Sequence, residues 1–283
     1  MRDYFCGWYL KCQSDTQTLA VIPAIHISKK TKSSSIQLIT EEGAWNIELP
    51  YQDFHKPKQR FHIHAAGNYF GQNGIKLCLH TPDCSAIGSV RFGAFSPIRY
   101  DIMGPFHYLP FMECQHSVLS MKHTVTGDFH INGTHYHFDN GVGYIEGDRG
   151  YSFPKEYAWT QCNFNNGSLM LSVADIPFGL FHFTGVIAVI QWQGKEYRLA
   201  TYLGAKAVKI ENGEIIICQG PMVLKVKLIE KHTHPLLAPV SGRMNRTIHE
   251  SASCRAFYCF QQGSHTLFSF ETSKASFEYE YAR

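Results

Sequence analysis

Short apolar stretches alternate with polar turn residues along nearly the whole chain. A periodicity of 3.6 residues is almost absent, so the pattern predicts strands rather than helices. The apolar stretches are LAVIPAIHIS (19–28), IKLCLH (75–80), SVLSMKHTV (117–125), LMLSVADI (169–176), TGVIAVIQW (184–192), EIIICQ (214–219) and VLKVKLIE (223–230).

Three Asn-Gly pairs fall between these stretches, at Asn73-Gly74, Asn132-Gly133 and Asn212-Gly213. Both residues of such a pair accept a positive φ, which makes it the strongest local signal of a two-residue hairpin. The segment GDFHINGTHYHF, residues 127–138, has the pattern of one complete hairpin. Many short strands joined by tight turns predict an all-β protein made of antiparallel barrels or sandwiches.

A weak internal sequence repeat suggests that the chain divides near its middle. Residues 8–25 and 159–177 each contain a Trp-bearing strand, a polar turn and an apolar strand with a proline at or near its end. We therefore expect two similar β-barrel domains, residues 1–152 and 153–283. The stretch GYIEGDRGYSFPKEYAWTQCN, residues 143–163, then lies at the domain junction, where ligand sites are common.

Composition narrows the range of partners. Of the 283 residues, 17% are charged and 14% are aromatic, and the net charge is +3. A charge this small predicts neither a nucleic acid nor an anionic membrane as partner. The N-terminus lacks the pattern of a secretion signal, so we expect a cytoplasmic protein whose nine cysteines stay reduced. The most apolar run, PFGLFHFTGVIAVIQW, is shorter than the roughly 20 residues of a membrane span, so we expect no transmembrane segment.

Three segments together resemble the tocopherol cyclase-like family. They are FCGWYLK (5–11), LPFMECQHSVLSMKHTVTGDFHING (109–133) and the junction stretch, with weaker likeness in AAGNYFGQNGI (65–75) and LLAPVSGRM (236–244). The resemblance implies a pair of lipocalin-like β-barrels, as in the related carotenoid 1,2-hydratase-like proteins. It also implies an isoprenoid or prenylquinol-like hydrophobic substrate, a reaction begun by protonating a double bond, and no cofactor.

Two positions depart from the family pattern. Arg149 stands where the resemblance implies a tryptophan after the acid, and Cys6 stands where an acid commonly precedes Gly-Trp-Tyr. The face of a tryptophan stabilises a carbocation, whereas an arginine repels one. The departures therefore bear on substrate and activity rather than on fold.

Glu146 and Asp148 are the candidate proton donors. Residues two apart on a strand point to one side, so one carboxylate can raise the pKa of the other and keep it protonated. We favour Asp148, which matches the acid of the family's Asp-Trp-Gly, at the mouth of an apolar cavity. Flanking Gly147 and Gly150 could bring its backbone close to a ligand. The alternative is a glycine-rich turn with both acids in water. His116 is a candidate proton relay, or else a structural histidine.

Further residues are candidates for contact with the substrate. Trp159, Gln161 and Asn163 alternate and share one strand face, either as a pocket wall or as a core tryptophan with amides at a barrel end. Trp8 and Tyr9 fall on opposite strand faces, one toward the cavity and one toward a core. The remaining candidates are Glu113, Tyr144 and Arg149, the last of which could pair with either acid.

Sixteen histidines raise the question of a metal. His62/His64, His135/His137 and His232/His234 are same-face pairs on strands, but each pair supplies only two ligands, and no third ligand is visible at the spacing of a metal-binding motif. No glycine-rich phosphate or dinucleotide motif occurs. We therefore expect no metal and no cofactor. Three functions stay open: an isoprenoid or prenylquinol cyclase, an olefin hydratase, and a non-catalytic binder of a hydrophobic ligand. The sequence does not indicate the oligomeric state of the protein.

Overall fold

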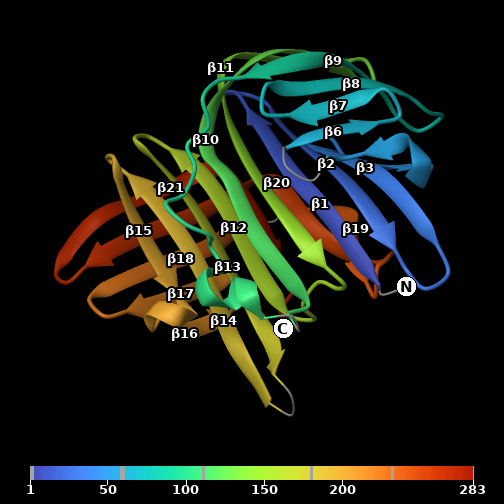
Figure 1. Cartoon of the computed structure of the whole chain (residues 1–283). Coiled ribbons are helices and arrows are strands. Elements are labelled where there is room, and N and C mark those ends of the chain that lie inside the picture. The colour runs from blue at the N-terminus through green and yellow to red at the C-terminus, as the bar shows by residue number, and fades with distance from the viewer. Residues whose placement is uncertain (1–2, 58–60, 110–111, 179–180, 231–232, 283) are drawn as a thin grey trace. The chain divides into compact units, whose positions relative to one another are not determined.

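The computed structural model describes residues 3–57, 61–109, 112–178, 181–230 and 233–282. In this part of the chain nearly all regular structure is β-strand, with three short 3-10 helices: η1 (Tyr51–Asp53), η2 (Gly104–Tyr108) and η3 (Thr201–Leu203). The strands form two antiparallel sheets (Figure 1). The predicted all-β class with two antiparallel lipocalin-like sheets is confirmed.

The first sheet has eleven strands, and every neighbouring pair is antiparallel. In spatial order they are β4 (Ala44–Leu49), β3 (Lys32–Thr40), β2 (Thr18–Ile27), β1 (Tyr4–Gln13), β11 (Thr134–Gly150), β10 (Cys114–Ile131), β9 (Ser85–Phe92), β8 (Gly74–His80), β7 (Asn68–Gly71), β6 (His62–Ala65) and β5 (Phe54–His55).

The second sheet has ten strands. Its main path is β15 (Lys195–Ala200), β14 (Phe181–Trp192), β13 (Gly167–Phe178), β12 (Tyr157–Phe164), β21 (His265–Tyr279), β20 (Arg243–Gln262), β18 (Met222–Glu230), β17 (Glu214–Gln219) and β16 (Lys206–Glu211), and β19 (His234–Val240) pairs with β20.

The chain forms two compact units that are not continuous halves. Unit 1 contains residues 1–97, 113–153 and 236–247, and unit 2 contains residues 98–112, 154–235 and 248–283. The segments 98–112 and 236–247 thus belong to the unit made mainly from the other half. Domains bounded at residue 152 stay a prediction.

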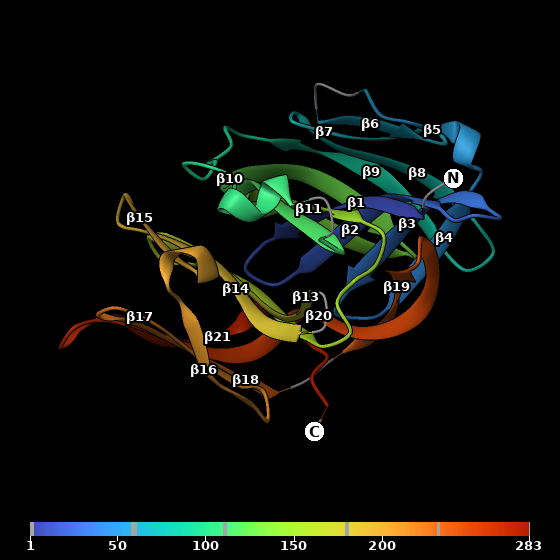
Figure 2. The same cartoon turned by 60° about the horizontal axis from the view of Figure 1, so that its bottom comes forward.

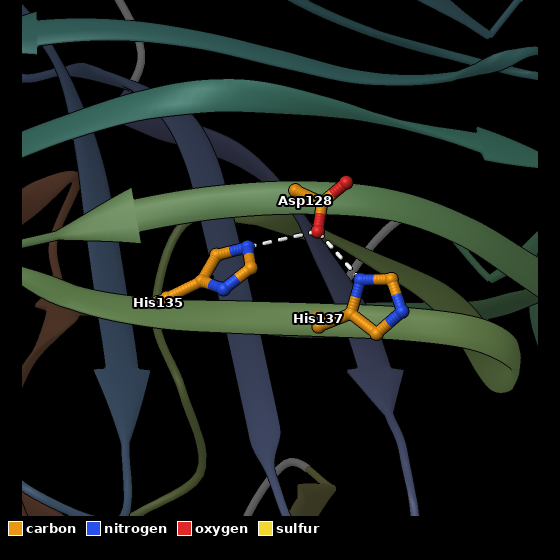
Figure 3. Close-up of side chains that lie close together, drawn as sticks. All are labelled: Asp128, His135 and His137. Carbon is orange, nitrogen blue, oxygen red and sulfur yellow. Dashed lines mark hydrogen bonds and ion pairs between the residues drawn. The ribbon is translucent and has the colours of Figure 1, made fainter.

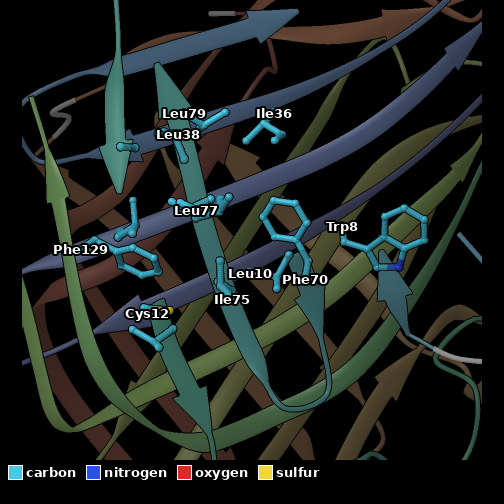
Figure 4. Close-up of a cluster of buried hydrophobic side chains, with 14 of the residues drawn as sticks. Trp8, Leu10, Cys12, Ile36, Leu38, Phe70, Ile75, Leu77, Leu79 and Phe129 are labelled. Atoms are coloured by element: carbon cyan, nitrogen blue, oxygen red, sulfur yellow. The ribbon is translucent and has the colours of Figure 1, made fainter. Parts of the chain in front are cut away.

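The core of unit 1 is formed by strands from both ends of the first sheet. Leu10 of β1, Leu38 of β3, Phe70 of β7 and Leu77 of β8 belong to one buried cluster (Figure 4). Because β3 and β7 lie near opposite ends of the strand order, the sheet curls around this core, as two views show (Figures 1 and 2). Inward and outward residues therefore alternate along each strand.

Unit 2 is built in the same way. Leu199 of β15, Leu171 of β13, Ile217 of β17 and Phe260 of β20 share a second buried cluster. The nine cysteines are free thiols. Among the described residues, no helix has the length and apolar character needed to cross a bilayer. The cytoplasmic location stays a prediction.

The hairpin signals are largely confirmed. The pairs Asn132-Gly133 and Asn212-Gly213 have positive φ at both residues, with 49° and 87° at the first and 51° and 75° at the second. At the β7–β8 turn only Gly74 has a positive φ, 143°. That glycine is required by space as well, because a Cβ there would lie 1.9 Å from the Val90 carbonyl oxygen.

Candidate functional site

The acids of the junction stretch lie on β11, on the face of the first sheet opposite the core. Ile145 belongs to the core of unit 1. Its neighbour Glu146 therefore points to the other face, together with Asp148 and Tyr144, because side chains alternate along a strand. Tyr9 of β1 pairs directly with Glu146 and shares this outer face. The predicted same-side placement of Glu146 and Asp148 follows directly.

His116 lies between the two acids. In the register of β10 and β11 it pairs directly with Asp148. Its Nδ1 lies 2.9 Å from Oδ1 of Asp148, and its Nε2 lies 3.2 Å from Oε2 of Glu146. The two carboxylates therefore interact through one imidazole ring, where the sequence had suggested a direct carboxylate pair.

Two more side chains extend this polar network. The Tyr144 hydroxyl donates a hydrogen bond of 2.5 Å to Oε2 of Glu146, and the Cys114 thiol donates one of 3.4 Å to Oδ1 of Asp148. Burial raises the pKa of both Tyr144 and Cys114 well above their ordinary values, and the neighbouring carboxylates raise them further. Both groups therefore stay protonated and act as donors to the acids.

The charge state of His116 is set by its two partners. Burial alone would lower its pKa, but the negative charges of Glu146 and Asp148 and their hydrogen bonds outweigh burial and hold the pKa well above its usual range. His116 is therefore an imidazolium at neutral pH. Of the three side chains Asp148 is the most exposed, at 23%, against 10% for His116 and 6% for Glu146. Asp148 is thus the member that a ligand can reach most easily.

The raised pKa of His116 makes stability depend on pH. Protonated His116 stabilises the folded state fully below its unfolded pKa of about 6.5, and this contribution is lost as pH rises through the higher folded pKa. The difference in unfolding free energy between the parent and His116→Gln should therefore shrink above about pH 6.5, by at most about 1.4 kcal/mol per pH unit. Urea unfolding of both proteins between pH 6 and 9 measures it. A constant or growing difference would contradict the assigned charge.

The glycine between the acids makes room for Trp8. Gly147 pairs with Trp8 across the strands, and a Cβ on residue 147 would lie 2.9 Å from Cδ1 of the indole. Trp8 itself lies in the core of unit 1 (Figure 4), and Lys56 Nζ lies 5.0 Å from its ring centroid. A Cβ on Gly150 would lie 2.0 Å from the Glu113 carbonyl oxygen. Both glycines thus accommodate neighbouring protein groups instead of the ligand that the sequence had suggested.

Arg149 takes no part in the acid network. It is exposed, pairs with Cys6 and Gln115 in the strand register, and donates its Nε to Oε1 of Gln115 at 3.0 Å. Arg149 directly follows Asp148 on β11, so its side chain points to the face opposite that of Glu146 and Asp148. The expected pairing of Arg149 with one of the acids is therefore corrected, since both acids interact with His116 instead.

The remaining candidates of unit 1 divide between the two faces. Of Trp8 and Tyr9, only Tyr9 shares the face of the acids. Glu113 lies just before β10, and its carbonyl oxygen accepts hydrogen bonds from the backbone N–H groups of Tyr151 and Ser152, at 2.9 and 3.3 Å. Tyr144 is fully buried, and its hydroxyl is bonded to Glu146. Tyr9 is buried as well, so direct ligand contacts of Tyr9 and Tyr144 stay predictions.

Trp159, Gln161 and Asn163 belong to unit 2 and lie on β12. Ala158 and Cys162 of this strand lie in the core of that unit, so the three candidates share the opposite face, as predicted. Trp159 and Gln161 are buried. The side-chain oxygen and nitrogen of Asn163 are both buried, with no hydrogen-bond partner in the described part of the chain. A direct ligand contact of Asn163 stays a prediction.

Buried polar side chains beyond the predicted candidates also take part in such contacts. Cys114 shares its strand face with His116 two residues away, a spacing that was visible in the sequence. In unit 2 the Tyr157 hydroxyl donates a hydrogen bond of 2.6 Å to buried Glu278, which pairs in register with buried Glu250. No local pattern links Tyr157 to a residue 121 positions later.

The geometry around His116 suits the exchange of protons. The ligand atoms of His116, Glu146 and Asp148 lie close enough together to bind a cation. However, the two acids face different nitrogens of one ring, and these nitrogens point in divergent directions. The donor atoms therefore do not converge on one point in this arrangement. The charged ring can instead pass its Nδ1 proton to Asp148 and take up another proton afterwards.

Comparison with known proteins agrees with the fold. The chain superimposes on CghA solved with Sch210972 at a TM-score of 0.63 and 9% identity, over 99% of this chain and 89% of that one. A putative AttH from Nitrosomonas europaea gives 0.55 and 8%, over 100% and 93%. Kievitone hydratase from Nectria haematococca gives 0.55 and 9%, over 97% and 88%. At such low identity these likenesses establish the fold alone.

Comparison of the sequence with known families gives one match that covers the residues of the acid network. No curated protein sequence gives a significant match to the chain. Residues 85–204 match the sequence model of the tocopherol cyclase-like family, and this range includes His116, Glu146 and Asp148. The resemblance of this chain to the tocopherol cyclase-like family is therefore confirmed over residues 85–204.

Proposed function

We propose that the chain catalyses a proton-initiated cyclisation of a prenylated quinol or a related isoprenoid double bond. The observation that carries the proposal is the placement of His116 between Glu146 and Asp148, within the range that matches the tocopherol cyclase-like family. Protonation of an alkene needs a positioned acid and a supply of protons, and this cluster contains both kinds of group.

The three side chains take different roles in this proposal. Asp148, the most exposed, delivers a proton to an alkene carbon, and His116 relays protons to it from behind. Glu146, fixed by the Tyr144 hydroxyl, keeps the imidazole oriented. The phenol oxygen of the substrate then bonds to the resulting cation, and the phenolic proton returns to the Asp148 carboxylate. The reaction is balanced as an isomerisation, so it needs no oxidant, reductant or group donor.

Hydration of an isoprenoid double bond is the second candidate. It uses the same proton donor, but a water molecule captures the cation and the product gains one water. Kievitone hydratase, whose fold is similar to that of this chain, is a hydratase by name. A non-catalytic binder of a hydrophobic ligand is the third, and it needs no proton transfer.

One experiment in heavy water separates the three candidates. The protein is incubated in D₂O with a prenylated quinol, and the products are analysed by mass spectrometry. Cyclisation should give an isomer of the substrate with one non-exchangeable deuterium at the protonated carbon. A product heavier by one water would support hydration instead. Saturable binding of the quinol without any product would support the non-catalytic binder and overturn the enzyme proposal.

A further inference from the structure

The hairpin that joins β10 to β11 has two different faces. Its inward side chains are Phe129, Ile131, Tyr136 and Phe138, which belong to the core of unit 1. Its outward side chains are Asp128, His130, His135 and His137. The register pairs Asp128 with His137 and His130 with His135, so these four outward residues form a square of neighbours. This hairpin lies outside the acid network at His116.

Asp128 brings two of the histidines together. Its Oδ1 lies 2.9 Å from Nε2 of His135 and 2.6 Å from Nδ1 of His137 (Figure 3). All three potential ligand atoms lie within 4.8 Å of one another. Zn²⁺ binds histidine nitrogen at about 2.0–2.1 Å, and tetrahedral ligands at that distance are about 3.3 Å apart. Small side-chain rotations therefore suffice to place an ion between the three atoms.

The backbone that carries the histidines is held in place. Gln17, from the turn between β1 and β2, donates to the carbonyl oxygen of His135 at 2.7 Å and accepts from the backbone N–H of His137 at 3.0 Å. The ring of His130 stacks on that of His135, with centroids 4.5 Å apart and planes at 14°. Both ligand histidines are thus constrained before any ion arrives, which lowers the entropic cost of binding.

We propose that Asp128, His135 and His137 form a binding site for a divalent transition-metal ion of the Zn²⁺ class. Two imidazoles and one carboxylate are a ligand set that Zn²⁺ accepts, with water in the remaining position. The predicted shortage of ligands at the His135/His137 pair is corrected by Asp128, which the sequence separates from it by a turn. His232 of the third histidine pair lies outside the described residues. His62 and His64 contact each other, with their Nε2 atoms 2.9 Å apart.

The test is metal titration of chelator-treated protein. Isothermal titration with ZnCl₂ should show one saturable site, and Co²⁺ should give the visible absorption of a low-symmetry site. Asp128→Asn, His135→Ala and His137→Ala should each weaken Zn²⁺ binding at this site at least tenfold. All three side chains are exposed or half-exposed, so the variants should fold like the parent, as circular dichroism checks.

The chain offers a matched control. His182 Nδ1 lies 2.7 Å from Oδ2 of Asp175, an equivalent pair of an exposed histidine and a half-buried aspartate without the second histidine. His182→Ala should bind Zn²⁺ like the parent. Absence of a saturable site, or equal affinity in all variants, would overturn the proposal. So would loss of binding only in His116→Gln, or Zn²⁺-dependent dimers in sedimentation, which would indicate an ion shared between two chains.

Discussion

Asp148→Asn should reduce turnover of a cyclisable prenylated quinol by about 10²–10⁴-fold, the range typical of a lost general acid. The amide keeps the size of the carboxylate and can still accept a hydrogen bond from His116 Nδ1, but it has no proton to transfer. Affinity for the quinol should change little. Steady-state kinetics with direct binding measurements separates the two effects.

Asp139→Asn is the matched control, because Asp139 is an exposed aspartate on the same strand and lies far along β11 from His116. It should keep the parent's rate. Loss of one carboxylate beside His116 should also lower the pKa of that histidine in Asp148→Asn, which NMR titration measures. An Asp148→Asn protein as active as the parent would remove Asp148 from the mechanism.

Phe129→Ala should lower the unfolding free energy by about 3–5 kcal/mol, as is usual when a buried phenylalanine is truncated. Phe129 is fully buried in the core of unit 1 and comes from the hairpin whose other face carries Asp128 and His130. The loss combines transfer of the ring from water with the cavity left behind. Urea unfolding measures this change.

Thr126→Ser on the same strand provides the comparison. Thr126 is exposed, and a conservative surface change usually alters stability by no more than about 0.5 kcal/mol. If the two variants were equally stable, the hairpin would not contribute to the core as the structure indicates.

Several features of the site could be read from local sequence. A strand places residues two apart on one side, so Glu146 and Asp148 had to share a face, as had Trp159, Gln161 and Asn163. The opposite placement of Trp8 and Tyr9 follows from the same rule. The coincidence of acids, glycines and aromatics in the junction stretch also has a local reason. One face of β11 carries the acids, and the other needs glycine at 147 to accommodate Trp8.

The local sequence could not predict which side chains of different strands come into contact. His116 reaches both acids because residues 116–118 of β10 pair with residues 148–146 of β11, and a shift by one residue there would turn its ring to the other face. Further along the same strand pair, beyond shifts in the register, Asp128 lies opposite His137.

The sequence by itself determined the strands, most of the turns and the side of each strand on which a residue lies. These features depend on backbone conformation and on a period of two, both of which are local properties. The tertiary structure alone decided which strands are neighbours, and therefore which charges meet. Tyr157 meets Glu278 because β12 pairs with β21, and Gln17 reaches His135 and His137 because β1 pairs with β11. These pairings join segments far apart in the sequence, and the packing of distant apolar residues in each core holds them together.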